Sequence, residues 1–199
     1  MRVIALDTTL ARCSVALADE ETILALKSEA MTRGHAEAIA PMVDEAMREA
    51  GAAFSELDRI VVTTGPGSFT GLRIGLAFAR GLAVSLDKPC VGVSTLEALA
   101  LEHGEHGRHG AAIAHGDDIF AALYEHGRAV QPPARLTLDE ARALFADAIV
   151  RGPAAERFGG NVTDAPDIAA LALRGARLDP ALHPPNPLYL RDSGARLPS

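Results

Sequence analysis

The chain has 199 residues, which is enough for one domain or two small lobes with a buried core. Hydrophobic residues make up 48% of it and charged residues 23%, a balance that is typical of a globular protein and excludes a disordered one. The formal net charge of −7 argues against a chain that holds nucleic acid by itself, because phosphate binding needs a basic face.

Three strand-like stretches open the chain. They are Val3–Asp7, Cys13–Ala18 and Ile23–Ser28. Because the strand pattern begins within the first few residues, we expect no signal peptide and no membrane span. Cys13 and the later Cys90 both lie among apolar residues, which favours buried free thiols in a cytosolic protein.

A helical pattern runs from His35 to Ala50, where apolar residues recur on one face. These residues are Ile39, Met42, Val43, Ala46, Met47 and Ala50. Two methionines on such a face suit an adaptable contact surface as well as a core. Pro41 lies inside the pattern and should kink the helix or mark a late start.

A run of glycines between an apolar strand and a second helical pattern is the most informative segment. The strand ends at Thr63, and the run is Gly65–Gly75. It is not a P-loop, because no lysine follows Gly71, and it is not a dinucleotide fingerprint, because the third glycine comes one residue late. Ser68 or Thr70 can cap the helix that follows.

Two uses of these glycines are open. Turned toward a ligand, the N–H groups at the helix start can hold a phosphate, although Pro66 has none to offer. Turned toward protein, a stripe of small residues lets another helix pack closely, from this chain or from a partner. The stripe is Gly71, Gly75, Ala79 and Ala83.

A polar, glycine-containing stretch at residues 101–110 divides the remaining pattern. Before it, Val91–Val93 reads as a strand, and Ser94 with Glu97 forms a capping box that opens a helix. The lobes expected on either side are residues 1–103 and 104–199, the second with a proline-rich, extended tail. Strands followed by alternating helices and strands predict an α/β fold with a mixed sheet.

The second part of the chain has shorter patterns. They are strands at Ala111–Ala114, Ile119–Glu125 and Ala148–Val150, a helix opened by a capping box of Thr137 and Glu140, and an extended end over 180–199.

Several short segments form a recognisable set, dense over residues 1–100 and sparse afterwards. They are Ile4–Thr9, Thr32–His35, Pro41-Met42, Gly65–Gly75, Gly92–Ala100 and Pro187–Arg191. The set resembles the TsaB family, also called YeaZ, and the glycine run is its most specific part.

The resemblance implies an actin/sugar-kinase/Hsp70-like (ribonuclease H-like) fold of two α/β lobes with mixed sheets. It implies a non-catalytic, cytoplasmic subunit that helps to make threonylcarbamoyladenosine beside the anticodon of tRNAs. The catalytic paralogue TsaD, which binds metal and nucleotide, pairs with the N-terminal lobe of TsaB, and the ATPase TsaE joins them. TsaB alone also forms homodimers through a similar surface. Contact with tRNA would be made only through the complex.

The resemblance thus directs attention to the two helices of the N-terminal lobe as a partner surface. The residues expected there are His35, Ile39, Met42, Val43, Ala46, Gly71, Gly75, Ala79 and Ala83. The alternative is that they pack inside the chain's own core. If they form the partner surface, Gly75→Leu abolishes pairing and leaves the chain folded, whereas unfolding favours core packing.

Asp7, Thr8 and Thr9 occupy the place where kinases and chaperones of the implied fold hold the phosphates of ATP. Together with Gly65 and Gly67 they are candidates for contact with a nucleotide and, through water, with Mg²⁺. The alternative is a turn whose side chains satisfy one another. We expect no nucleotide on the chain alone, with ATP or ADP still open for the complex. A small phosphotransferase is the enzyme alternative.

Histidines raise the question of a metal site, and we expect none. TsaD-like relatives hold metal with two histidines four residues apart, but His35 is followed at that spacing by Ile39. This argues against a metallopeptidase and leaves His35 as an interface or capping residue. His103, His106 and His109 lie in a glycine-containing loop that would be costly to order around a metal, which favours a solvated linker.

Overall fold

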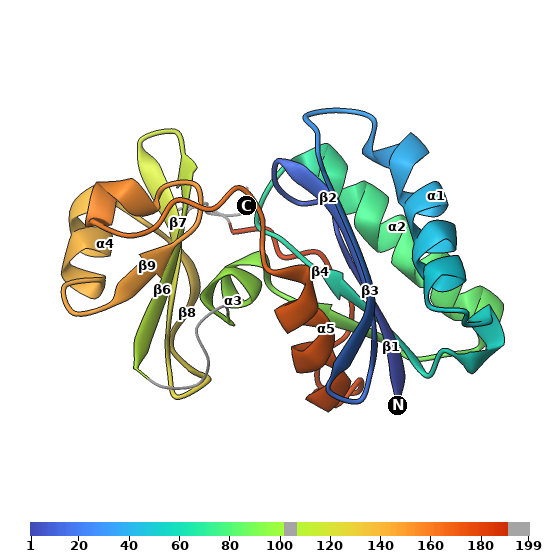
Figure 1. The fold of residues 1–199 in the computed structure, drawn as a ribbon. Coiled ribbons are helices and arrows are strands. Elements are labelled where there is room, and N and C mark those ends of the chain that lie inside the picture. Colours follow the sequence, from blue (N-terminus) through green and yellow to red (C-terminus); the bar gives the residue numbers. More distant parts are fainter. Residues whose placement is uncertain (102–106, 191–199) are drawn as a thin grey trace, which may run out of the picture.

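Two β-sheets dominate the computed structural model, which describes residues 1–101 and 107–190. Figure 1 shows the sheets apart from each other, with α3 (Thr95–Ala100) between them. The first sheet has the strand order β3-β2-β1-β4-β5 and the second β8-β7-β6-β9. Both contain parallel and antiparallel pairs, which confirms the expected α/β class with mixed sheets.

The first sheet comes from the first half of the chain. Its strands are β1 (Arg2–Asp7), β2 (Arg12–Asp19), β3 (Thr22–Ala30), β4 (Arg59–Thr63) and β5 (Cys90–Val93). β1 pairs antiparallel with β2 and parallel with β4, and β5 continues the parallel part. The carboxyl ends of β1, β4 and β5 therefore meet at one edge, where open α/β sheets form their ligand sites.

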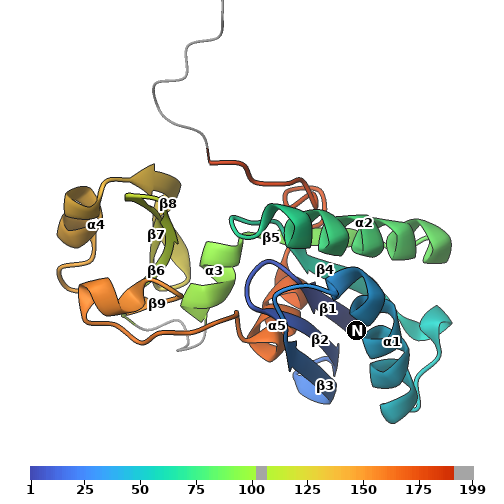
Figure 2. The ribbon, with the colours of Figure 1, turned by 90° about the horizontal axis from the view of Figure 1, so that it is seen from above.

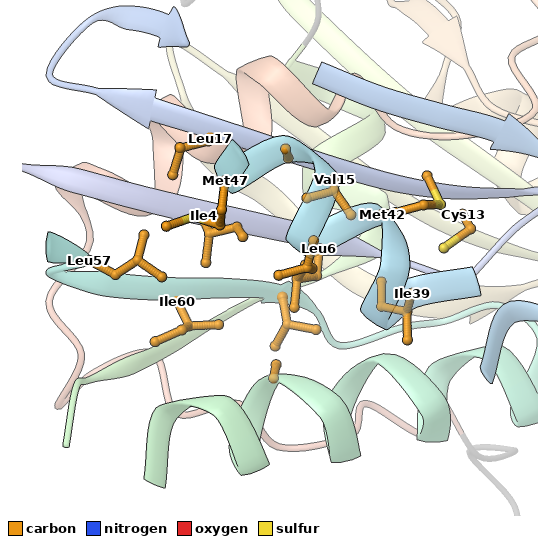
Figure 3. Packing of buried hydrophobic residues seen from close by; sticks show 14 of the residues in the cluster. Ile4, Leu6, Cys13, Val15, Leu17, Ile39, Met42, Met47, Leu57 and Ile60 are labelled. Atoms are coloured by element: carbon orange, nitrogen blue, oxygen red, sulfur yellow. The ribbon is translucent and has the colours of Figure 1, made fainter. Parts of the chain in front are cut away.

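Helices cover both faces of the first sheet (Figures 1 and 2). They are α1 (His35–Glu49) and α2 (Phe69–Leu86) on one face and α5 (Ile168–Arg177) on the other. Alternate residues of a strand point to opposite faces. Ile4 and Leu6 accordingly belong to the core beneath α1 and α2 (Figure 3), whereas Val3 and Ala5 pack with the residues of α5.

The second sheet is smaller and is covered by shorter helices. Its elements are β6 (Arg108–His115), β7 (Asp118–Glu125), β8 (Arg128–Leu136), α4 (Leu138–Leu144), β9 (Ile149–Arg151) and the 3-10 helix η3 (Ala155–Phe158); a further 3-10 helix, η1 (Phe54–Glu56), precedes β4. Ile119, Leu123 and Phe145 share its core. On the side facing the first lobe, Leu96 and Leu99 of α3 pack against the sheet.

The strands and helices expected from the sequence are present, with shifted ends. The capping box at Thr137 is complete, since Glu140 N donates to Thr137 Oγ1 at 3.3 Å and Thr137 N donates to Glu140 Oε2 at 2.8 Å. Ser94 caps α3 by accepting from Glu97 N at 2.9 Å. The Glu97 carboxylate does not close that box, because it accepts from Arg174 Nε at 2.9 Å.

Three features of the helices and strands depart from the sequence-based expectation. α1 begins at His35 and contains Pro41, so the late start is wrong. β8 was not among the expected strands; it contains Pro132 and Pro133 and lies at the sheet edge, where missing N–H donors need no partner. α5 was not expected either, although it completes the packing of the first sheet.

α5 brings the chain back from the second lobe to the first. A Cβ at Gly175 would lie 2.3 Å from a methyl group of Val61, so only glycine permits this approach to β4. Arg59 Nη1 donates to the carbonyls of Gly175, Ala176 and Leu178 at 2.8, 2.8 and 2.7 Å and caps the helix end. A boundary at residues 103 and 104 stays a prediction, and α5 packs across it.

An extended segment follows α5 and lies along the end of the first lobe. Gly92 N donates to His183 O at 2.9 Å, and Leu188 N donates to Thr64 O at 2.7 Å. The extended form expected for the tail is therefore present at residues 184–190, whereas residues 180–183 form a turn in which Leu182 N donates to Asp179 O at 3.1 Å. Arg191 of the last family-like segment lies outside the described residues.

Candidate functional site

A buried cluster of polar side chains lies at the carboxyl ends of β1 and β4, which we call the Asp7 cluster. It consists of Asp7, Thr9, Thr63 and Thr95. Oδ1 of Asp7 accepts from Thr9 N at 3.1 Å and from the hydroxyls of Thr9 and Thr63 at 2.6 Å each. Thr95 Oγ1 donates to Thr9 Oγ1 at 3.1 Å. The cluster therefore ties β1, β4 and the start of α3 together.

The second carboxylate oxygen of Asp7 and the ring of His35 lie near this cluster. Neither Asp7 Oδ2 nor His35 Nε2 has a hydrogen-bond partner within the described part of the chain. Burial raises the pKa of Asp7, against the opposing effects of the Thr63 and Thr9 hydrogen bonds and of His35. α1 begins after Gly34 without a side-chain cap, so the expectation that His35 is a capping residue is wrong.

The glycine run packs against the turn that follows β1. Ser68 caps α2, as expected, by accepting from Gly71 N at 3.2 Å. Thr8 Oγ1 donates to Gly71 O at 2.7 Å, and Ser68 N donates to Thr9 O at 2.7 Å. A Cβ at Gly71 would lie 1.9 Å from Thr8 O, and one at Gly67 would lie 2.3 Å from Thr9 O. The glycines thus allow close packing within the chain.

The structure brings the candidate nucleotide contacts together, but protein covers most of them. Asp7, Thr8 and Thr9 have no exposed surface, and Gly65 is buried beside the carbonyl of Leu188. Their hydroxyl and carbonyl groups are already hydrogen-bonded to the chain itself. A phosphate could reach the Asp7 carboxylate only if these contacts opened.

The nine residues expected at a partner surface all lie in the chain's own core. They are His35, Ile39, Met42, Val43, Ala46, Gly71, Gly75, Ala79 and Ala83. Figure 3 shows Ile39 and Met42 among the core side chains between α1 and the sheet. The reason is that a periodic apolar face is first of all the face that covers a sheet. Partner contact through these side chains stays a prediction, and they offer a partner almost no exposed surface.

A second face of α2 is apolar and exposed, and we call it the outer α2 face. It consists of Ile74, Ala77, Phe78, Gly81 and Val84, which follow one another at helical spacing. Val84 is 83% exposed, Ala77 and Gly81 are exposed, and Ile74 and Phe78 are half-buried. A Cβ at Gly81 would have nothing within 4 Å. This face was missed in the sequence, where attention fell on the small-residue stripe.

The hydropathy of α2 carried the missing signal. Its 18 residues have a mean hydropathy of 1.3, yet only 33% of them are buried. By length and composition alone such a helix is also long enough to cross a membrane, but here it lies along the first sheet. A helix that has a second apolar face beside the one covered by the sheet indicates an unused contact surface.

Neither the histidines nor the cysteines form a metal site in the part of the chain that is described. His109 is buried in β6, and His103 and His106 lie outside the described residues. Cys13 and Cys90 are free, as expected, and Cys90 is only half-buried. Burial raises the pKa of each thiol to about 11, so both stay protonated and unreactive at neutral pH.

The strand order of the first sheet, with helices on both faces and a buried carboxylate at the end of β1, defines an actin/sugar-kinase/Hsp70-like (ribonuclease H-like) protein. YeaZ from Pseudomonas aeruginosa is 31% identical, with a TM-score of 0.78 over 94% of this chain and 100% of that one. A second P. aeruginosa structure, described as similar to peptidase YeaZ, is 32% identical, with a TM-score of 0.77 over 96% and 99%. The chain belongs to the TsaB (YeaZ) family.

Curated relatives carry the same family name. The tRNA threonylcarbamoyladenosine biosynthesis protein TsaB of Escherichia coli is 41% identical over 100 residues, which are 50% of this chain and 43% of that protein. The protein of that name from Bacillus subtilis is 34% identical over 132 residues, 63% and 56%. The matches therefore span about half the length of these relatives.

The chain is also similar to the paralogous transferase. The family model of TsaD, tRNA N6-adenosine threonylcarbamoyltransferase, matches residues 25–116. A transferase of that name from Clostridium perfringens is 49% identical over 69 residues, which are 35% of this chain and 20% of that protein. The matched residues of the TsaD model include both α1 and α2.

Proposed function

We propose that the chain is a non-catalytic subunit in tRNA threonylcarbamoyladenosine biosynthesis, and that it pairs with TsaD through the outer α2 face. The observation that carries the proposal is this face itself. Ala77, Gly81 and Val84 give it a smooth apolar centre, without a charged side chain among its members. Contiguous apolar surface of this kind on a folded protein marks a site of protein contact.

The similarity to TsaD supports the choice of partner. A paralogue that shares residues 25–116 is expected to have helices equivalent to α1 and α2. Two related surfaces can then meet about a pseudo-twofold axis, helix pair against helix pair, as identical surfaces do in a symmetric dimer. The same geometry would allow two copies of this chain to form a homodimer when TsaD is absent.

The remaining parts of the proposal concern ligands. The covered Asp7 cluster supports a chain that binds no nucleotide by itself, with ATP or ADP binding only in the complex with TsaD and TsaE. The net charge of −7 supports contact with tRNA through the partners rather than by the chain itself. We place this work in the cytoplasm, away from membranes, because tRNA modification takes place there.

Ala77→Glu tests the proposed surface, because Ala77 is exposed at its centre and glutamate is a good helix former. We expect light scattering to show no homodimer and no complex with TsaD, while circular dichroism shows a folded chain. Ala143→Glu makes the same change on the exposed side of α4 and should leave both assemblies intact. Unchanged assembly of Ala77→Glu would contradict the proposed surface.

A further inference from the structure

A cavity of about 250 Å³ lies where α3 and α5 meet the second sheet, and it shares no residue with the Asp7 cluster. Ala100, Leu101, Ala170 and Leu173 supply aliphatic parts of its wall. Charged and polar groups converge on it as well, from α3, α5 and β7. Apolar walls with a few convergent polar groups are the usual composition of a small-molecule site.

Two opposite charges lie side by side in the wall. Arg174 of α5 donates from Nε to Glu97 Oε1 of α3 at 2.9 Å, and the two side chains are 30% and 18% exposed. A guanidinium has five N–H donors, and this hydrogen bond uses one of them. Both partners therefore retain hydrogen-bonding capacity toward the cavity, the arginine as donor and the glutamate as acceptor.

Tyr124 of β7 adds a neutral polar group. Its side chain is 7% exposed and lines the same cavity. Burial raises the pKa of Tyr124 above its usual range, although the hydrogen bond with Ser94 opposes the shift. The hydroxyl therefore stays protonated at neutral pH and adds polarity without charge.

We propose that this cavity binds a small zwitterion, a free α-amino acid, with the carboxylate at Arg174 and the ammonium group at Glu97. A second arginine of the lining, Arg177, is already paired with Glu21 at 3.0 Å. At the Glu97–Arg174 pair a simple anion would meet the repulsion of Glu97 and a simple cation that of Arg174, whereas a zwitterion pairs with both. The volume lies below the roughly 300 Å³ at which ordinary ligand pockets begin, which favours a ligand of this size over a nucleotide. The ligand's side chain would lie against Leu173 and Ala170.

The proposal is tested by titrating the full ¹⁵N-labelled chain with L-alanine, L-valine, L-threonine and L-leucine to about 10 mM, followed by NMR, since millimolar sites are then largely filled. We expect saturable shifts at Ala170 and Leu173 for at least one of them. Its N-acetyl and amide derivatives, each lacking one charge, should bind about tenfold or more weakly. Absence of saturable shifts, or binding of either derivative as tight as that of the free amino acid, overturns the proposal.

Two variants locate the site. Ala170→Leu fills the cavity without changing a charge and should abolish the shifts; retained binding overturns the assignment to this cavity. Arg174→Gln should weaken binding about tenfold or more. Because Arg174→Gln leaves Glu97 without its partner, circular dichroism checks that this variant is folded. If Arg174→Gln unfolds, the result for Ala170→Leu decides whether the ligand binds in this cavity. Arg142→Gln, an exposed arginine of α4, is the matched control and should bind as the parent does.

Discussion

At the scale of single residues, two glycines of α2 differ sharply in their surroundings. A Cβ at Gly71 would lie 1.9 Å from the backbone oxygen of Thr8, whereas one at Gly81 would meet nothing within 4 Å. We expect Gly71→Ala to lower the free energy of unfolding by about 2–3 kcal/mol through overpacking. Gly81→Ala should raise it by about 0.5–1 kcal/mol, because alanine favours the helix.

Chemical denaturation of the isolated variants measures both effects. Equal effects of the two substitutions would contradict the account of the glycine run as an intramolecular contact. Gly75 belongs with Gly71, since its Cβ would lie 2.5 Å from Thr8 Oγ1. Gly75→Leu is therefore expected to unfold the chain, which is the core-packing outcome left open by the sequence.

Asp7 predicts a pH dependence of stability. Its folded-state pKa is raised by burial, so the folded chain holds the proton more tightly than the unfolded chain does. Its contribution to stability is full below the unfolded pKa of about 3.9 and is lost as pH rises through the folded pKa. The asparagine of an Asp7→Asn variant does not titrate. As pH rises, the parent should therefore lose unfolding free energy relative to this variant.

Urea unfolding of the parent and of Asp7→Asn between about pH 4.5 and 7.5 measures this difference in unfolding free energy. Because both chains share all other titratable groups, the effects of those groups cancel in the comparison. Asp44→Asn, at an exposed position of α1, serves as the control and should follow the parent at every pH. A difference between Asp7→Asn and the parent that is independent of pH would show that the buried carboxyl does not titrate with folding.

At the scale of elements, Arg59 fixes α5 to the first sheet. Its guanidinium donates to three carbonyl groups at the helix end. Arg59→Met keeps much of the apolar stem and removes these bonds, and we expect a loss of about 1.5–3 kcal/mol in unfolding free energy. Arg48→Met, whose side chain is 73% exposed, should cost under about 0.5 kcal/mol in the same denaturation experiment. Equal losses would contradict the capping role.

The elements also show what the sequence could predict. Strands such as β1 and helices such as α1 followed from local periodicity, and the Thr137 capping box followed from two residues three apart. α5 was missed although its local signals were present, since Ile168, Leu171 and Ala172 recur at helical spacing and Asp167 caps the first turn. Its place against the first sheet, however, depends on distant residues. Its glycine at position 175 is explained by Val61, and the cap at its end is Arg59, more than a hundred residues earlier in the chain.

The candidate site likewise has a part that the sequence predicted and a part that depends on tertiary packing. The convergence of Asp7, Thr9 and the glycine run was implied by the family-like segments. Their burial was not, because it depends on which backbone atoms fill the space in front of each glycine. Likewise, the periodic face of α2 was recognised, but its orientation toward the sheet left the opposite face for a partner.

At the scale of the whole molecule, the covered Asp7 cluster predicts that the chain alone binds nucleotide poorly. Isothermal titration with ATP and Mg²⁺ should give a Kd weaker than about 1 mM. Binding in the micromolar range that is lost in Asp7→Ala would contradict this expectation and favour the phosphotransferase alternative. Asp44→Ala is the matched control on the surface.

Pairing through the outer α2 face is the central claim, and light scattering after size exclusion tests it most directly. The chain is measured alone and after mixing with TsaD of the same organism. We predict a homodimer with twice the mass of the 20.8 kDa chain, which is replaced by a one-to-one complex when TsaD is added. A monomer that stays separate from TsaD, with or without nucleotide and TsaE, would contradict the account.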